Sequence, residues 1–308
     1  MSLVRPILNA YLRYIEKPRL ARTENYLKIR KSFEFQARWF FRTPKGTQKQ
    51  WLVLEAGQRQ VEALEVVPQD LHSDAVLFYI HGGAFIIGSP NTHSAMLADL
   101  CRRLGARALL PRYRLAPEHP YPAAAEDVMT AWQGLLASGA NPAHVFIGGD
   151  SAGGQLALGL LSELCTSGQV LPAGVFCLSP LTDMRCNSDS FRRNRNREVM
   201  LTSDVAGQTM AIYLDGHPAE DPRVSPQFAG FPNAPPTWIC VGDTELLYDD
   251  ARLMAERLNA FGADVTLVEA QDLPHVWPMF KDILPEARQT LTDLTDWIRR
   301  QPAWPGES

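Results

Sequence analysis

The sequence has few cysteines, no long apolar segment and no excess of positive charge, and each absence excludes a class of protein. The longest strictly apolar runs, such as Ala75 to Ile80, stop near six residues, far below the roughly 20 that cross a bilayer. The chain of 308 residues has 30 Lys and Arg against 34 Asp and Glu, so it lacks the basic footprint of a nucleic-acid-binding protein. We therefore expect neither an integral membrane segment nor a nucleic-acid partner.

Cysteine usage bears on metal binding and on the redox compartment. An odd number of five cysteines, without a CxxC or Cys/His ligand spacing, argues against both a disulfide framework and a zinc site. Near the N-terminus Arg5 and Pro6 interrupt the apolar residues, and no signal-peptide core with a cleavage site follows. These patterns predict free thiols in a cytoplasmic protein. The cysteines are Cys101, Cys165, Cys177, Cys186 and Cys240.

From residue 51 onward, short β-rich segments alternate with longer helical patterns, which is typical of an α/β fold. Strands such as Val76–Ile80 are almost continuously apolar, and this indicates a mostly parallel sheet buried on both faces. The first two strands are joined through Gly57 without a helix, so we expect an antiparallel hairpin at one edge. The eight predicted strands are Trp51–Ala56, Val61–Val67, Ala75–His81, Arg107–Tyr113, His144–Gly148, Gly174–Ser179, Thr237–Val241 and Val265–Ala270. The predicted helices lie around Ala95–Leu104, Ala123–Ala137, Ala152–Cys165, Asp249–Phe261 and Ala287–Arg300.

Two segments fall outside this alternation. In the first, apolar residues recur at helical spacing between Leu3 and Ile15, and a basic, aromatic stretch runs from Arg30 to Arg42. We expect an amphipathic helix packed on the body of the protein, with a membrane-surface anchor as the alternative.

The second segment is an insertion of nearly sixty residues between the strand ending at Ser179 and the strand starting at Thr237. It contains an arginine cluster, interpreted as a solvated loop, and a helical patch near Ser203–Leu214. An insertion of this size inside an α/β domain is usually a lid or cap.

The stretch from Gly149 to Gly153 carries the strongest chemical signal. Gly149, Ser151 and Gly153 satisfy the GxSxG pattern at the end of an apolar strand and the start of a helical pattern. A strand that turns sharply into a helix with its serine pushed outward leaves no room for side chains two positions on either side. This context predicts Ser151 as a nucleophile, whereas Asp150, beside it on the tight turn, should point elsewhere.

A serine hydroxyl is a weak nucleophile and needs a base that is itself oriented by a carboxylate. In the chain order nucleophile, acid, histidine, only His217 and His275 follow Ser151. His275 stands just beyond the last strand, at the carboxyl end of the sheet where ligands gather, so we expect it to be the base. His217 is interpreted as an exposed loop histidine.

The acid should follow the strand Thr237–Val241, where four carboxylates are available. Asp249 and Asp250 have the positions of an N-cap and a first helical turn. Asp243 and Glu245 remain, and local chemistry does not decide between them.

The reaction also needs N–H donors for the oxyanion that forms when a carbonyl is attacked. One donor should be the backbone N–H of Ala152, the residue after the nucleophile. Its partners should come from Gly82 and Gly83, in a glycine loop after the strand that ends near Ile80.

Together these residues resemble the hormone-sensitive-lipase-like esterases of the α/β-hydrolase superfamily. The resemblance rests on three motifs in order, His81 to Ala84, Tyr113 to Ala124 and Gly149 to Gly154, and it covers about residues 50 to 300. We interpret the middle motif as a structural loop that braces the sheet. The resemblance implies an α/β-hydrolase fold with an α-helical cap, in which the N-terminal segment covers the acyl pocket. It also implies Ser151 as nucleophile, His275 as base and Gly82, Gly83 and Ala152 as the oxyanion hole.

The family usually shows an aspartate about thirty residues before the histidine, in a DPLxD-like turn. This chain departs from that pattern because the residue at this spacing from His275 is Glu245. We therefore favour Glu245 as the acid and keep Asp243 as the alternative. Glutamate can serve because the acid only has to hold the imidazole tautomer and stabilise its charged form.

The predicted function is that of a serine carboxylesterase acting on short- to medium-chain esters, with no metal and no organic cofactor. The alternatives are an amide, carbamate or lactone hydrolase with the same residues, or a non-catalytic small-molecule receptor of the same fold. The expected partner is a small-molecule ester, and a homodimer is a candidate assembly. The predicted domains are an N-terminal cap segment, 1–45, and a catalytic domain, 46–308, with 183–228 as a cap or lid insertion.

Overall fold

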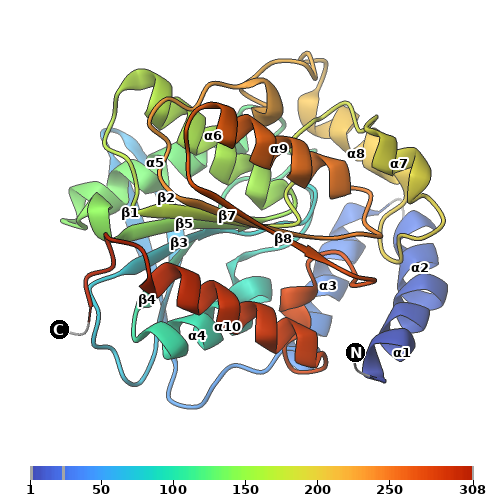
Figure 1. Ribbon diagram of the computed structural model, residues 1–308, viewed down its shortest axis with the longest axis horizontal. Helices are drawn as coiled ribbons and strands as arrows, with labels where there is room; N and C mark the ends of the chain where they lie inside the picture. The colour runs from blue at the N-terminus through green and yellow to red at the C-terminus, as the bar shows by residue number, and fades with distance from the viewer. Residues whose placement is uncertain (1–2, 23–24, 307–308) are drawn as a thin grey trace.

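Eight strands pair into one sheet in the order β1-β2-β4-β3-β5-β6-β7-β8 (Figure 1). The computed structural model describes residues 3–22 and 25–306. Each predicted strand segment overlaps an observed strand, so the prediction of a mostly parallel eight-stranded sheet is confirmed. The strands are β1 Gln48–Ala56, β2 Arg59–Val67, β3 Val76–Ile80, β4 Arg107–Pro111, β5 Val145–Asp150, β6 Gly174–Leu178, β7 Thr237–Gly242 and β8 Val265–Ala270.

The predicted hairpin lies at one edge of the sheet. β1 pairs antiparallel with β2 through a turn at Gly57, whose φ of +62° is a conformation that favours glycine. β2 also pairs antiparallel with β4, and the pairings from β4 to β8 are parallel. The carboxyl ends of the parallel strands therefore meet at one end of the sheet.

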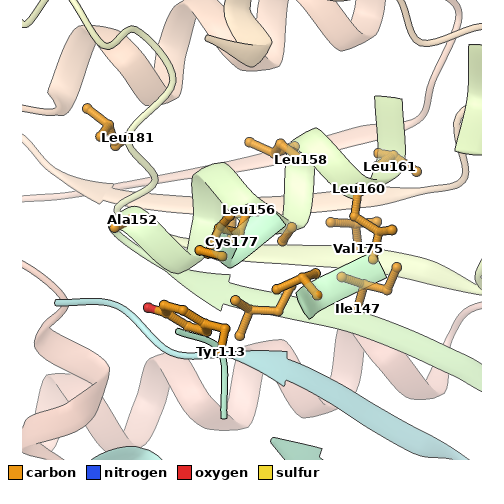
Figure 2. Close-up of a cluster of buried hydrophobic side chains, with 14 of the residues drawn as sticks. Tyr113, Ile147, Ala152, Leu156, Leu158, Leu160, Leu161, Val175, Cys177 and Leu181 are labelled. Carbon is orange, nitrogen blue, oxygen red and sulfur yellow. The ribbon is translucent and has the colours of Figure 1, made fainter. Parts of the chain in front are cut away.

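Helices cover both faces of the sheet (Figure 1). α4 and α10 pack on one face, and α5, α6 and α9 pack on the other, each over its own apolar core. Figure 2 shows Leu160 of α6 beside Val175 of β6 and Ile147 of β5, and Leu156 of α6 beside Cys177 of β6. Each such fully buried side chain stabilises the fold by about 1.5–3 kcal/mol. The helices are α4 Pro90–Leu104, α5 Ala123–Ala137, α6 Ala152–Ser167, α9 Tyr248–Ala260 and α10 Pro285–Arg299, with short 3₁₀ turns at Pro142–His144, Pro226–Phe228 and Trp277–Phe280.

The two additions both lie at the carboxyl ends of the parallel strands (Figure 1). The Arg13 guanidinium donates to the carbonyls of Asn196 and Arg197, and Lys17 donates to the carbonyl of Glu198 at 2.8 Å. These bonds tie the N-terminal segment to the insertion. The N-terminal segment is α1 Val4–Tyr11, a π-helical turn Leu12–Glu16, α2 Lys17–Arg22 and α3 Tyr26–Phe40, and the insertion carries α7 Asp189–Arg193 and α8 Ser203–Leu214. Of the helices formed by the described residues, none is both long and apolar enough to cross a membrane.

Close packing between β5 and β6 yields a stability prediction. Gly148 pairs with Phe176, and a Cβ at Gly148 would overlap the Phe176 ring. Gly148→Val should therefore lower the free energy of unfolding by about 1–3 kcal/mol, measured by urea denaturation followed by circular dichroism.

The matched control is Gly207→Ala on the exposed side of α8, where no described atom lies within 4 Å of an added Cβ. This change should raise the free energy of unfolding by up to about 1 kcal/mol, because alanine favours the helix over glycine. An unchanged unfolding midpoint for Gly148→Val would contradict the packing argument.

Candidate active site

Ser151 occupies a sharp turn between β5 and α6, as the GxSxG pattern predicts. Its φ of +51° and ψ of −119° lie outside the regions that side chains usually adopt, and the residue is half-buried. A Cβ at Gly149 would overlap the backbone of Gly153, and a Cβ at Gly153 would overlap the carbonyl of Ile80. Glycine is therefore needed at both positions for β5 to turn into α6 with the serine presented outward.

His275 and Glu245 form a buried pair beyond β7 and β8. The imidazole Nδ1 lies 2.6 Å from Glu245 Oε2, and the two residues are 5% and 1% exposed. Glu245 Oε1 accepts bonds from the Gly242 N–H at 2.6 Å and from the Ser179 hydroxyl at 2.8 Å. Because both carboxylate oxygens are engaged, the acid has one fixed orientation toward the imidazole.

Asp243, the alternative acid, is directed away from His275. Its Oδ1 accepts the N–H of Asp272 at 2.7 Å, and its Oδ2 lies 3.0 Å from the Arg197 guanidinium. The side chain is 35% exposed, unlike that of Glu245. The structure thus brings Glu245, and not Asp243, to the imidazole.

The pKa of His275 reflects opposing effects. Burial lowers this pKa, but the hydrogen bond that His275 donates to Glu245 and the negative charges of Glu245, Glu198 and Asp150 outweigh burial. The pKa of His275 is therefore raised above its ordinary value of 6.5. The surroundings favour a positively charged imidazole, which is the form that a general base acquires when it accepts a proton.

The glycine loop differs from the prediction at Gly82. The N–H of Gly82 donates to Asp150 Oδ1 at 2.9 Å, so this donor is already used. Gly83 and Ala84 have positive φ values of +118° and +53°. Both residues line the two cavities beside Ser151, whereas Gly82 is not among the described residues that line either cavity. Gly83, Ala84 and Ala152 thus line a cavity together with Ser151, and the sequence did not single out Ala84.

The Asp150 carboxylate fixes the position of the glycine loop through its hydrogen bond with Gly82. Besides Gly82, this buried carboxylate accepts the Tyr79 hydroxyl at 2.8 Å and lies 3.3 Å from His93 Nε2. Burial alone would raise the pKa of Asp150, but these partners outweigh it and hold the pKa below its ordinary value. Asp150 is therefore bonded to Tyr79, Gly82 and His93 and not to His275, as expected, and its role is structural. No local pattern could have identified Tyr79 and His93, which come from β3 and α4.

The Tyr113 to Ala124 motif supports the same loop. The Tyr113 hydroxyl donates to the His81 carbonyl at 2.8 Å, and its ring stacks on the His81 imidazole at 4.3 Å. Burial, with the nearby His93, lowers the pKa of His81 to about 3, so this histidine stays neutral. The Ala116 N–H donates to the Phe85 carbonyl at 2.9 Å. The motif therefore braces the loop that carries Gly83 and Ala84.

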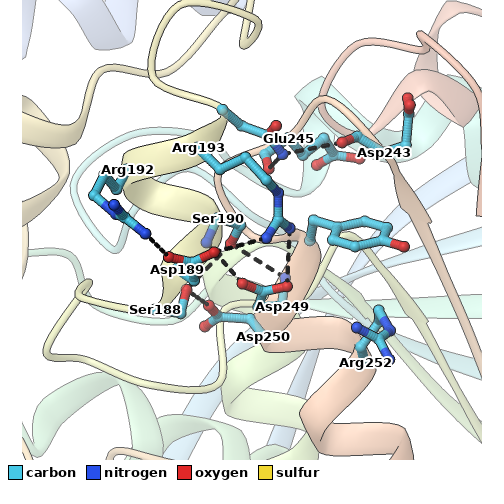
Figure 3. A network of polar contacts seen from close by, with 12 residues as sticks. Ser188, Asp189, Ser190, Arg192, Arg193, Asp243, Glu245, Asp249, Asp250 and Arg252 are labelled. Atoms are coloured by element: carbon cyan, nitrogen blue, oxygen red, sulfur yellow. Dashed lines mark hydrogen bonds and ion pairs between the residues drawn. The ribbon is translucent and has the colours of Figure 1, made fainter.

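The insertion is fastened to the turn that carries Glu245 (Figure 3). Asn194 donates to the carbonyls of Asp243 and Glu245 at 3.0 and 2.8 Å. The buried Glu198 accepts the Leu246 N–H at 3.2 Å, and burial raises the pKa of Glu198. Sequence patterns missed Asn194 and Glu198 because both lie in an irregular segment without periodicity.

The predicted arginine cluster is only partly a solvated loop. Arg193 pairs with Asp189 and Asp249 at 2.9 and 3.1 Å (Figure 3). Arg197 lies 3.0 Å from Asp243, whereas Arg192 is highly exposed. Two of the arginines therefore help to attach the insertion, Arg193 to the first turn of α9 and Arg197 to the turn before it.

Two cavities flank Ser151, and both reach Gly83 and Ala84. The smaller, about 180 Å³, includes Ala152 and apolar side chains of the insertion. The larger, about 590 Å³, includes His275 and side chains of α1, α2 and α3.

Within residues 3–22 and 25–306, no cluster of His, Cys, Asp and Glu has an arrangement that could hold a metal ion. His217, the other candidate base, pairs with Asp221 at 2.9 Å in the insertion.

The sequence and the fold are similar to those of known esterases. A profile of the family described as alpha/beta hydrolase fold matches residues 77–279. An esterase from Acinetobacter venetianus is 35% identical over 234 residues, which cover 76% of this chain and 77% of that protein. An acetyl-hydrolase from Streptomyces hygroscopicus is 37% identical over 223 residues, covering 72% and 75%. The crystal structure of an esterase from the bacterial hormone-sensitive lipase family superposes with a TM-score of 0.90 at 34% identity, covering 98% of this chain and 99% of that one.

The chain therefore belongs to the α/β-hydrolase family and, within it, to the hormone-sensitive-lipase-like esterases. This result confirms the resemblance drawn from the three sequence motifs.

The charge environment of His275 leads to a titration prediction. The His275 imidazole should titrate above pH 6.5, as measured by NMR of the ring resonances, with assignment by comparison with His275→Asn. Glu245→Gln should lower this pKa because it removes the charge nearest the ring. Asp243→Asn should change it little, because Asp243 faces Arg197 and Asp272. A wild-type pKa at or below 6.5 would contradict the assigned environment.

Proposed function

We propose that the protein is a serine carboxylesterase in which Ser151 is the nucleophile, His275 the base and Glu245 the acid. The observation that carries this proposal is the 2.6 Å contact between His275 and Glu245 beside a cavity shared with Ser151. The names of the relatives, esterase and acetyl-hydrolase, support the reaction class. No residue in the proposed reaction requires a metal or an organic cofactor.

In the proposed reaction, Ser151 Oγ attacks the ester carbonyl carbon while its proton passes to His275 Nε2. Glu245 accepts a hydrogen bond from the Nδ1–H of His275 and stabilises the imidazolium. The oxyanion is stabilised by N–H groups, which we assign to Gly83, Ala84 and Ala152. Gly82 is left out of the hole because its N–H is bonded to Asp150.

The tetrahedral intermediate then expels the alcohol, which leaves with the proton from His275. Water attacks the resulting acyl-enzyme, and His275 takes a proton from this water. His275 then returns the proton to Ser151 as the carboxylic acid product is released. The free enzyme is regenerated with all its protons in their starting positions.

The two cavities suggest which part of the ester lies on each side of Ser151. The alcohol must leave near His275, which protonates it, and only the larger cavity includes His275 among its described lining. The acyl group then occupies the smaller cavity, which is similar in size to a cavity of about 150 Å³ that holds benzene. This supports short to medium acyl chains and a larger apolar alcohol.

We further propose that residues 1–45 and 183–228 act together as a cap. The larger cavity is lined by Leu12, Phe33 and Phe40 of the N-terminal segment, and the smaller one by Phe191 and Met210 of the insertion. The N-terminal segment also lines the smaller cavity, through Leu20, Tyr26 and Ile29, so it would cover the acyl side, as the resemblance implies, as well as the alcohol side. A homodimer stays a prediction, and so does a cytoplasmic location, which the free and mostly buried cysteines support.

The nucleophile and the acid can be tested with p-nitrophenyl butyrate. Ser151→Ala should lower kcat by a factor on the order of 10⁴ or more. Glu245→Gln should lower kcat by a factor on the order of 10³, because the imidazole loses the group that fixes its tautomer.

Asp243→Asn is the matched control and should leave kcat within about threefold of wild type, since Asp243 faces other partners. The serine mechanism fails if Ser151→Ala turns over at the wild-type rate. The choice of acid fails if Asp243→Asn is impaired and Glu245→Gln is not.

The assignment of the cavities can be tested with isomeric esters. 3-Phenylpropyl acetate should be hydrolysed with a kcat/KM at least roughly tenfold above that of methyl 4-phenylbutanoate, because only the acetate puts the bulky group in the larger cavity. Propyl acetate and methyl butanoate are the matched small pair, and their values should lie close together because both acyl groups fit. Equal rates for the two phenyl esters, or a faster methyl ester, would refute the assignment.

A further inference from the structure

The outer face of α3 exposes large apolar side chains in a regular stripe. Leu27, Phe35 and Trp39 are 57%, 64% and 72% exposed. Lys31 lies between Leu27 and Phe35 at the same four-residue spacing. The rings of Phe35 and Trp39 lie 6.1 Å apart. Such an exposed group of apolar side chains on one helix marks an interaction surface.

The charge on this face is of one sign. Lys28, Lys31 and Arg38 are exposed, and none of their side chains pairs with a carboxylate among the described residues. The one carboxylate of α3, Glu34, is half-buried and accepts a hydrogen bond from Ser89. Residues 1 to 42 hold ten Lys and Arg against three Glu, although the whole chain has a net charge of −4.

The same helix forms a wall of the larger cavity. Lys28, Ser32, Gln36 and Phe40, again four residues apart, line this cavity. Each follows directly after a member of the exposed stripe, so the two stripes are neighbours on the helix surface. A molecule that covers the outer face therefore lies next to the cavity in which we place the alcohol.

The chemistry of the face identifies its partner. A second copy of this chain would bring an identical cationic face against it, and like charges oppose such contact. An anionic lipid surface matches both features, because Lys and Arg attract its headgroups while Trp, Phe and Leu enter the boundary region. Tryptophan in particular favours the membrane–water boundary.

We propose that the outer face of α3, defined by Leu27, Lys31, Phe35, Arg38 and Trp39, docks on an anionic lipid surface. Docking sets the larger cavity beside that surface, so that lipid-soluble esters enter from it. The docking rests on the face alone, whereas the delivery of an ester rests on the proposed esterase function.

The test is cosedimentation of the full chain with vesicles of phosphatidylcholine alone and of phosphatidylcholine mixed with phosphatidylglycerol. Wild type should bind the anionic vesicles at least roughly tenfold more than the neutral ones, and added salt should release it. The variants F35S/W39S and K31E/R38E should each reduce binding at least roughly tenfold. Neither pair lines a cavity, so both variants should hydrolyse p-nitrophenyl acetate at the wild-type rate, which also shows that they fold.

Matched controls carry the same kinds of change elsewhere on the surface. L71S/V170S removes two exposed apolar side chains, and R59E/R300E reverses two exposed charges, and both should bind like wild type. Failure of wild type to bind anionic vesicles, or equal binding to both vesicles, overturns the proposal. Dimerisation that F35S/W39S abolishes, without vesicle binding, would make a second copy the partner and also overturns it. Vesicle binding by a protein inactive on p-nitrophenyl acetate supports the docking and overturns the esterase function.

Discussion

The buried carboxylate of Asp150 is the constraint on which the candidate active site depends. A buried, unpaired carboxylate costs several kcal/mol, at an order of magnitude, so its partners must converge on it. Those partners are the Gly82 amide, the Tyr79 hydroxyl and the His93 imidazole, from a loop, a strand and a helix. Because Asp150 immediately precedes Ser151, satisfying this charge also sets the distance between the nucleophile and the glycine loop.

Much of this arrangement could be predicted from the sequence, because its determinants are local. The apolar strands, the hairpin at Gly57 and the strand-turn-helix around Ser151 all follow from patterns within a few residues. Local chemistry did not decide between Asp243 and Glu245. The acid-to-histidine spacing that the resembling family shows favoured Glu245, the residue that lies against the imidazole. Which amide of the glycine loop is free could not be predicted, since the direction of the Gly82 N–H depends on Asp150, far along the chain.

The insertion illustrates the same limit. Its length suggested a lid, but its irregular sequence gave no indication that Asn194 and Glu198 hold the turn bearing Glu245. The insertion is hydrogen-bonded both to the turn that carries Glu245 and to the N-terminal segment. Because the insertion and the N-terminal segment both line the two cavities, the shape of the cavities is coupled to the orientation of Glu245. In the N-terminal segment, helical spacing predicted the helix of residues 4 to 11, whereas the π-helical turn after it has no simple sequence signature.

A thiol and a hydroxyl share the smaller cavity, and their surroundings give them different reactivities. Cys186 lies on the cavity wall, and burial with the nearby Asp250 and Asp183 raises the pKa of its thiol to about 12. A protonated thiol is a poor nucleophile. Ser151, by contrast, has in the proposed reaction a base, His275, that removes its proton at the moment of attack. The cavity is therefore chemoselective: an electrophile bound in it should acylate the intrinsically weaker oxygen and leave the sulfur unmodified.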